Sequence, residues 1–441
     1  MKQTIYLILI LLIGCSESKT DLVVKLTSQE GYGTFTPGRV VVWPSNDSIS
    51  YQNTSKDLDE FVVRSLPLQK EQYYWNLYLN NKIEKERFEK IIKHFKIDTT
   101  KLSDSFIDCE VLFLIGTKSD KRIIIIDSDN DEDFGDEKVL EYEYPLSKEK
   151  QKEISNALPV VSVQYEYFEN GKKSNRIANI KPSPYKGSLG LTFNTDNQVE
   201  KKYYLFASFP EYKDGDIILN GLDYHVFMSN RFSGVSYPTN ETSVFINPKS
   251  DSLPSELEGD IPYRIGDVFN VKGHDYLIDS ISTWGEELFI KYIGVNTKPV
   301  GITEGFYMPK FEAKHLDNSI FELKQHPDKY ILLDFWGTWC NPCIKFIPEL
   351  KKINTEFKQD KFVLVSVAYD RDPEKVNDFI DKENMNWEHV FVNQNQENKN
   401  SLIGKLKVYS YPTTILINPD GKIIARNKTM DEIREMLKNA L

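Results

Sequence analysis

The chain of 441 residues has few cysteines, few histidines and no excess of positive charge. Four cysteines, of which only two lie close together, do not make the even framework of a disulfide-stapled protein. Six scattered histidines supply no second pair of ligands at suitable spacing, so no zinc site is expected. The 55 basic residues are outnumbered by 66 acidic ones, and the net charge of −11 argues against a nucleic-acid partner.

Long apolar runs are also missing from the chain. No segment approaches the ~20 consecutive apolar residues that a transmembrane helix needs. Hydrophobic residues nevertheless make up 40% of the chain and aromatic residues 12%, a composition typical of globular proteins. Because 441 residues are too many for one compact core, we expect two or three domains.

The N-terminus has the features of an export signal. Lys2 is followed by an apolar run, Ile5–Ile13, that is too short to cross a bilayer but suits a signal peptide. The run ends at Gly14-Cys15, which resembles the bacterial lipoprotein signal. That resemblance implies a signal peptide over residues 1–14, a lipid on Cys15 and a tether over residues 15–20. The alternative is an ordinary signal peptide with a chance cysteine.

Residues 21–297 show mostly strand patterns with some helix. We expect an α+β region over residues 21–108, with an amphipathic helix that includes Phe88, Ile91 and Ile92. Residues 109–297 contain many short apolar, β-branched runs separated by turn residues, which predicts a β-rich, sandwich-like module. Residues 295–308, which contain Pro299, Gly301 and Gly305, indicate a linker.

One loop of the β-rich module is strongly acidic and is a candidate calcium site. Alternate side chains of a short loop can converge on a hard cation, which prefers six to eight oxygen ligands. Here the candidate ligands are Asp127, Asp129, Asp131 and Asp133. The pattern departs from an EF-hand, because Glu132 takes the glycine position and Lys138 the final bidentate position. The other interpretation is a solvated acidic hairpin loop.

Cys109 is the cysteine left over from the anchor and the close pair. It alternates with Val111 and Phe113 onto one face of a predicted strand. This pattern favours a buried, inert thiol over a third redox cysteine.

The close pair of cysteines lies where an apolar strand leads into a helix. The motif Cys340-Asn341-Pro342-Cys343 follows the strand-length run 330–336 and precedes a helix-like segment, 344–357. Cys340 is therefore expected to lie exposed at a helix N-terminus, where free backbone N–H groups and the helix dipole lower the pKa of its thiol. Cys343 is close enough to reach the first sulfur, and Pro342 costs no hydrogen bond in a first helical turn.

An acidic residue near this motif is a candidate proton carrier. Asp334 lies inside the apolar strand before Cys340, and burial would raise its pKa so that it exchanges a proton with the resolving thiol.

The C-terminal region resembles the thioredoxin superfamily, and more narrowly the membrane-anchored TlpA/ResA-like disulfide reductases. The resemblance covers residues 305–441. It rests on ordered motifs, namely Phe335-Trp336-Gly337-Thr338-Trp339-Cys340-Asn341-Pro342-Cys343, Tyr411-Pro412-Thr413-Thr414 and Asn418-Pro419-Asp420-Gly421-Lys422. It implies an α/β thioredoxin fold. Many relatives carry a glutamate just after the second predicted strand, 362–368, where this chain has Tyr369-Asp370, so Asp370 is a second-choice acid. Phe346 replaces another acidic residue common in the family. Both departures leave the redox potential and the substrate open.

The resemblance also implies residue roles. Cys340 would be the nucleophile, Cys343 the resolving cysteine, Asp334 the buried acid and Pro412 a cis proline. The residues expected around this site are Trp339, Asn341, Pro342, Tyr411 and Thr413. No cofactor is expected for catalysis, since the cysteine pair itself carries the electrons.

The leading functional hypothesis is a lipid-anchored reductase of protein disulfides in the bacterial cell envelope, on the periplasmic side. By resemblance, a membrane thiol carrier would supply its electrons. A disulfide oxidase or isomerase of the same fold is the second hypothesis, and only the redox potential separates the two. The third is a lipid-anchored binding protein in which the thioredoxin-like domain is a scaffold. A peroxiredoxin is disfavoured, because Gly337 stands where that family has a threonine.

Overall fold

A computed structural model describes residues 21–35, 37–45, 51–54, 57–144, 147–184, 203–232, 234–249, 262–311, 313–357, 360–396 and 402–441. The signal peptide and Cys15 lie outside the described residues. The contacts divide the chain into two compact units, Met1–Phe269 with Tyr276–Tyr292, and Asn270–Asp275 with Ile293–Leu441. No helix among the described residues is long and apolar enough to span a membrane.

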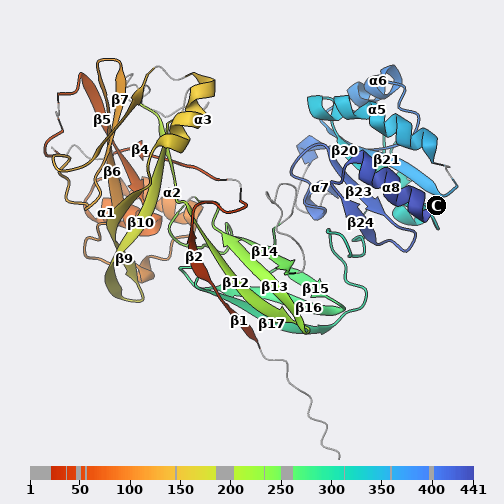
Figure 1. Ribbon diagram of the computed structural model, residues 1–441, viewed down its shortest axis with the longest axis horizontal. Coiled ribbons are helices and arrows are strands. Elements are labelled where there is room, and N and C mark those ends of the chain that lie inside the picture. The colour runs from red at the N-terminus through yellow and green to blue at the C-terminus, as the bar shows by residue number, and fades with distance from the viewer. Residues whose placement is uncertain are drawn as a thin grey trace, which may run out of the picture. The chain divides into compact units, whose positions relative to one another are not determined.

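The first unit is built mainly from antiparallel sheets (Figure 1). A five-stranded sheet has the order β4 (Trp43–Pro44), β5 (Glu60–Pro67), β6 (Glu110–Lys118), β7 (Lys121–Ile126) and β8 (Val139–Glu143). A four-stranded sheet has the order β3 (Val40–Val41), β11 (Leu205–Ser208), β10 (Lys172–Pro184) and β9 (Val161–Glu169). One buried core joins these two sheets and includes Phe113, Ile124, Val163 and Ile180.

Two further four-stranded sheets bring the N-terminal strands beside strands from much later in the chain. The first has the order β14 (Ser243–Pro248), β13 (Leu222–Ser229), β12 (Glu211–Leu219) and β2 (Thr27–Glu30). The second has the order β1 (Leu22–Lys25), β17 (Glu287–Val295), β16 (His274–Ile281) and β15 (Val268–Val271). The expected boundary between residues 108 and 109 falls between β5 and β6, which are neighbours in one sheet.

Among the residues that the structure describes, the α-helices of the first unit are α1 (Lys70–Leu79), α2 (Lys85–Phe95) and α3 (Lys148–Ala157). The amphipathic helix expected around Phe88 is α2, and Phe88 is buried with residues of α1. Helices α1 and α3 were not anticipated. The prediction of a mostly β region with some helix is confirmed for the part of the first unit that the structure describes.

The second unit contains one mixed, seven-stranded sheet. Its order is β19 (Ile320–Phe321), β18 (Ala313–His315), β22 (Glu388–Asn393), β21 (Phe362–Asp370), β20 (Tyr330–Trp336), β23 (Thr413–Ile417) and β24 (Ile423–Arg426). β20, β21 and β22 run parallel to one another, whereas β23 is antiparallel to β20 and β24 to β23. The strand predicted over residues 330–336 is therefore the central β20.

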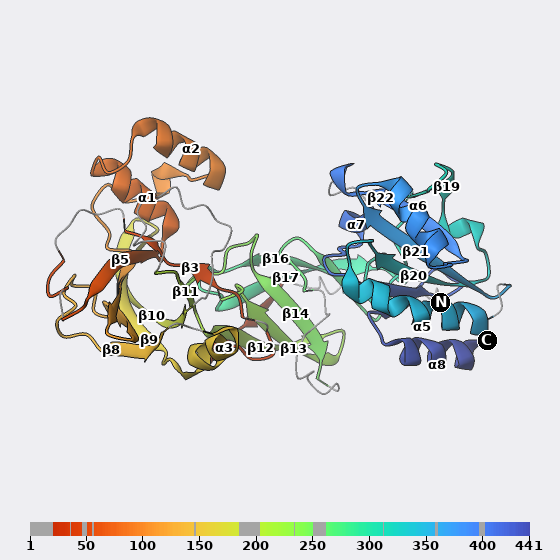
Figure 2. The same ribbon diagram turned by 90° about the horizontal axis from the view of Figure 1, so that it is seen from above.

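Helices cover both faces of this sheet. They are α5 (Asn341–Glu356), α6 (Pro373–Lys382), α7 (Leu402–Lys405) and α8 (Met430–Ala440). Side chains of α5, α6 and α8 pack with Leu332 or Trp336 of β20, and Figure 2 shows α5 and α8 on one side of the sheet. Side chains of α7 pack with Leu333 and Phe335, which point to the opposite face because side chains alternate along a strand. The α/β fold expected for the C-terminal region is confirmed.

Candidate active site

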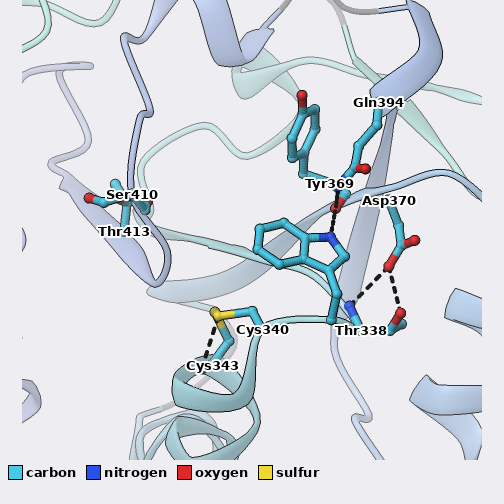
Figure 3. Close-up of a disulfide and its surroundings, with 9 residues drawn as sticks. Thr338, Cys340, Cys343, Tyr369, Asp370, Gln394, Ser410 and Thr413 are labelled. Atoms are coloured by element: carbon cyan, nitrogen blue, oxygen red, sulfur yellow. Dashed lines mark hydrogen bonds between the residues drawn. A yellow bond between two sulfur atoms is a disulfide. The ribbon is translucent and has the colours of Figure 1, made fainter. Parts of the chain in front are cut away.

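Cys340 and Cys343 form a disulfide where β20 leads into α5. Cys340 is the residue that caps the N-terminus of α5, and Pro342 lies in the first turn of the helix. The backbone N–H of Cys343 donates a hydrogen bond to the Cys340 sulfur over 3.2 Å (Figure 3). A free N–H aimed at this sulfur, together with the helix dipole, favours its thiolate once the disulfide is reduced.

The two cysteines are more enclosed than the sequence suggested. We expected Cys340 to be exposed, but in the disulfide form it is 4% exposed and Cys343 is 3% exposed. They belong to an apolar cluster with Trp336, Ile347 and Val376, because β20, α5 and α6 converge there. Trp339, immediately before the pair, is 48% exposed and is the accessible side chain of this turn.

The turn before Cys340 is held by the end of β21. The buried Asp370 accepts hydrogen bonds on Oδ2 from the backbone N–H of Thr338 over 3.0 Å and from its hydroxyl over 2.7 Å. The Trp339 indole N–H donates to the Tyr369 carbonyl over 3.0 Å, as drawn in Figure 3. A Cβ at Gly337 would come within 2.8 Å of the same carbonyl oxygen, so only glycine fits there. Asp370, our second-choice proton carrier, positions this turn.

A cis peptide bond lies on the other loop beside the cysteines. The Tyr411–Pro412 bond is cis, and the Tyr411 ring packs against the cluster that contains both cysteines. The Tyr411 ring stacks on Tyr369 with ring centroids 5.6 Å apart and forms a T-shaped pair with Trp339 at a centroid distance of 5.2 Å. Thr413 donates its hydroxyl to the Ser410 carbonyl over 2.8 Å, which ties this loop together. An aromatic surface therefore borders the disulfide.

Asp334 lies beneath the active-site helix. It shares the face of β20 with Leu332 and Trp336, which pack with α5. The side chain is buried, and burial raises the pKa of this carboxyl to about 7. A carboxyl with this pKa can gain or lose a proton near neutral pH, which is the property a proton carrier for the resolving thiol needs.

The hydrogen-bond partner of Asp334, and the residue that orients this partner, were missed by sequence reasoning. Ser366, opposite Asp334 on β21, donates its hydroxyl to Oδ2 over 3.0 Å and so opposes the rise in pKa. The Trp387 indole N–H donates to the Ser366 hydroxyl oxygen over 2.9 Å. Because an indole N–H can only donate, it leaves the serine hydrogen for Asp334. The available signal was Ser366 itself, a hydroxyl inside an apolar strand.

The acidic loop brings together three of its four candidate ligands. Carboxylate oxygens of Asp127, Asp129 and Asp131 lie within 4.8 Å of one another. Asp127 is buried, and its oxygens accept the N–H groups of Asp131 and Glu132. Asp133 is directed elsewhere: it accepts from the Asn53 side-chain amide at 2.8 and 3.0 Å. The structure therefore groups three of the four candidate ligands, and calcium binding at this loop stays a prediction.

Cys109 is buried, as predicted, and burial raises the pKa of its thiol. Its Sγ contacts the Gln69 carbonyl at 3.7 Å and lies 3.9 Å from the Asn76 amide nitrogen. A thiol held neutral in such a place does not attack disulfides.

Comparison with known proteins agrees with this geometry. A family model described as thioredoxin-like matches residues 328–423. The thiol-disulfide oxidoreductase ResA of Bacillus thuringiensis subsp. konkukian is 29% identical over 153 residues, which cover 34% of this chain and 86% of that protein. The thioredoxin-like protein YneN of Bacillus subtilis is 30% identical over 150 residues, which cover 33% of this chain and 82% of YneN.

One solved structure that aligns with part of this chain is a thiol-disulfide oxidoreductase from Bacteroides fragilis. It is 27% identical and aligns with a TM-score of 0.29, covering 31% of this chain and 99% of that one. The alignments with these relatives therefore extend over about a third of the chain.

Proposed function

The chain belongs to the thioredoxin-like family and is a thiol–disulfide oxidoreductase, and we propose that it reduces disulfide bonds of exported proteins. The observation that carries the proposal is the Cys340–Cys343 disulfide at the N-terminus of α5, above the buried Asp334. The pair can hold the two electrons of the reaction without a cofactor, because forming and breaking its own S–S bond stores them.

In the proposed reaction, the reduced protein begins with Cys340 as a thiolate and Cys343 as a thiol. The Cys340 sulfur attacks one sulfur of the substrate disulfide, the substrate S–S bond breaks, and the leaving thiolate takes up a proton. Asp334 then accepts the proton of Cys343, whose thiolate attacks the Cys340 sulfur of the mixed disulfide. The second substrate thiolate leaves and is protonated, and the pair is left as the disulfide that the structure contains.

The oxidised pair must then be reduced again by two electrons from another thiol. We propose a membrane thiol carrier as this donor, since an exported protein has no access to cytosolic reductants. Residues 328–423 match the family model, and the relatives named ResA are thiol-disulfide oxidoreductases.

The midpoint potential of the Cys340–Cys343 couple tests the direction of the reaction. We expect a value of about −250 mV or lower, in the range of thioredoxin, measured by equilibration with glutathione or dithiothreitol buffers and mass analysis of the trapped thiols. A value near −120 mV, in the range of strong oxidases, would instead support the alternative disulfide oxidase. Cys109→Ser serves as the control, because its thiol is buried and should leave the potential unchanged.

We also propose that the mature protein is anchored by lipid on Cys15 and faces the periplasm. The support is the apolar run before Gly14-Cys15, which resembles a lipoprotein signal. Mass spectrometry of the mature N-terminus should find a diacylated Cys15, and Cys15→Ala should move the protein from the membrane fraction to the soluble one. Two acyl chains give stable attachment, so the loss should be nearly complete. Membrane association that survives in Cys15→Ala would contradict the proposal.

A further inference from the structure

The first unit contains a cavity that the redox reaction does not use. Its volume is about 440 Å³, within the range of small-molecule sites. Strands β2, β9, β10 and β12 contribute to its walls, together with the segments around Asn230 and Trp284. The charged and aromatic residues of the lining that bear on its chemistry are Arg176, Glu211, Lys213, Tyr237, Trp284 and Glu286.

Arg176 presents an unpaired cation to this cavity. The carbon of its guanidinium lies 3.4 Å from the centre of the Trp284 ring. Trp284 in turn forms a T-shaped pair with Tyr167, with ring centroids 4.6 Å apart. The Nε atom of Arg176 is buried and has no hydrogen-bond partner. Within the described ranges, the guanidinium forms no ion pair either. Buried donors are almost always paired in folded proteins, so this group requires an explanation.

The second cation of the cavity is satisfied by its neighbours, in contrast to Arg176. Lys213 is 5% exposed and donates to Glu211 over 2.9 Å and to the Ser28 hydroxyl over 2.5 Å. Glu211 is therefore engaged by Lys213. Glu286 also lines the cavity, but its exposed side chain makes no ion pair with Arg176. The lining thus contains one cation that lacks an anionic partner.

We propose that this cavity binds a ligand through a carboxylate group held by Arg176. Stacking on Trp284 fixes the guanidinium plane, so the N–H edge is already oriented for two parallel hydrogen bonds to a planar carboxylate. Phe209, Val235 and Tyr237 supply apolar wall for the body of the ligand. A monoanion fits better than a phosphate dianion, because only one cation is unpaired and the carboxylate of Glu286 is nearby.

The test uses N-acetyl-L-phenylalanine as the probe, since it joins one carboxylate to an apolar body. Its neutral counterpart, N-acetyl-L-phenylalaninamide, is the matched comparison. Calorimetry on the full chain, with tryptophan fluorescence as a second readout, should show the acid binding at least tenfold more tightly than the amide. Arg176→Gln should weaken binding of the acid at least tenfold, and Arg176→Lys should weaken it less, because the charge remains but the planar fork is lost.

Lys172→Gln is the control variant, because it removes one positive charge from the exposed end of the same strand. It should bind the acid as the unaltered protein does. Equal affinity for acid and amide, unchanged binding by Arg176→Gln, or no saturable binding of the acid at concentrations on the order of 10 mM would overturn the proposal. So would binding that appears only in Glu286→Gln, because Glu286 would then be the natural partner of Arg176. If Arg176→Gln does not fold, the comparison of acid with amide on the unaltered protein still tests whether the cavity recognises a carboxylate.

Discussion

Cys343→Ser should accumulate covalent complexes with its substrates, joined through Cys340. The first attack survives in this variant, because the Cys340 sulfur keeps its place at the N-terminus of α5. The resolving attack is lost, because serine cannot displace the substrate sulfur. Non-reducing electrophoresis of cells that express the variant should show bands that vanish on reduction, and mass spectrometry of those bands would identify the substrates.

Cys340→Ser is the matched variant and should behave in the opposite way. It removes the attacking sulfur, so the rate of reduction of a model disulfide such as insulin should fall by on the order of a thousandfold or more. It should also trap nothing, because Cys343 lacks the position of Cys340 as the N-cap residue of α5, and Cys109 is buried with a raised pKa. If Cys343→Ser traps no protein and the unaltered protein reduces no disulfide, the enzymatic proposal fails. The chain would then be better explained as a binding protein with a thioredoxin-like scaffold.

Asp334→Asn should slow the resolving step while making the protein more stable at alkaline pH. The carboxylate of Asp334 accepts the proton of Cys343 in the proposed reaction, and removal of such a base typically costs on the order of a hundredfold in rate. In the unaltered protein this step should become slower as the pH falls below about 7, because Asp334 is then protonated. In Asp334→Asn that dependence should disappear. Stopped-flow mixing of a preformed mixed disulfide measures the step directly.

Although Asp334→Asn should slow the resolving step, it should stabilise the folded protein. The pKa of Asp334 is about 7 in the folded protein against 3.8 for an ordinary aspartate, so the folded state holds the proton more tightly than the unfolded state. Stability should therefore fall as the pH rises from about 4 to about 7 and stay low above that. Asp334→Asn should therefore raise the free energy of unfolding by on the order of 4 kcal/mol at pH 8 and by much less at pH 5. Calorimetry at both pH values measures this difference in stability. The relevant thermal transition is the one whose midpoint shifts when the disulfide is reduced.

Two variants separate this mechanism from a general disturbance. Ser366→Ala removes the hydrogen bond that favours the carboxylate, so the pH midpoint of the resolving step should rise by about half a unit to one unit. Asp378→Asn changes an exposed acid on α6 and should leave both rate and stability unaltered. A resolving rate in Asp334→Asn that matches the unaltered protein at every pH would remove Asp334 from the reaction.

The redox motif could be read from the sequence because its signals are local. The apolar run 330–336, the turn at Gly337 and the helix after Pro342 are consecutive, and the structure forms β20 and α5 from them. The second predicted strand, 362–368, likewise corresponds to β21. Short-range patterns decide such elements, because a strand or helix must present one apolar face to a core.

The first unit was predicted less completely, although part of the missing signal was present. The β9–β10 hairpin was not anticipated, yet Asn170-Gly171 joins its strands, and both residues have positive φ angles, 53° and 75°. Asparagine followed by glycine between two strand-like segments is the signature of a tight hairpin turn. Helix α1 carries no clear apolar stripe, because polar Gln72 and Asn76 are buried in it beside Tyr73 and Leu77. Its helical period was therefore hidden from the sequence pattern.

The sequence by itself determined the family, the redox pair and the expectation of a buried acid, because each depends on residues that are adjacent or nearly so. Only the tertiary structure decided what surrounds them. Ser366 meets Asp334 through the register of parallel strands 32 residues apart, and Asp370 reaches Thr338 across the same separation. Arg176 and Trp284 are in contact although they lie still further apart in the sequence. Such pairings depend on how whole strands align and pack, which no short stretch of sequence encodes.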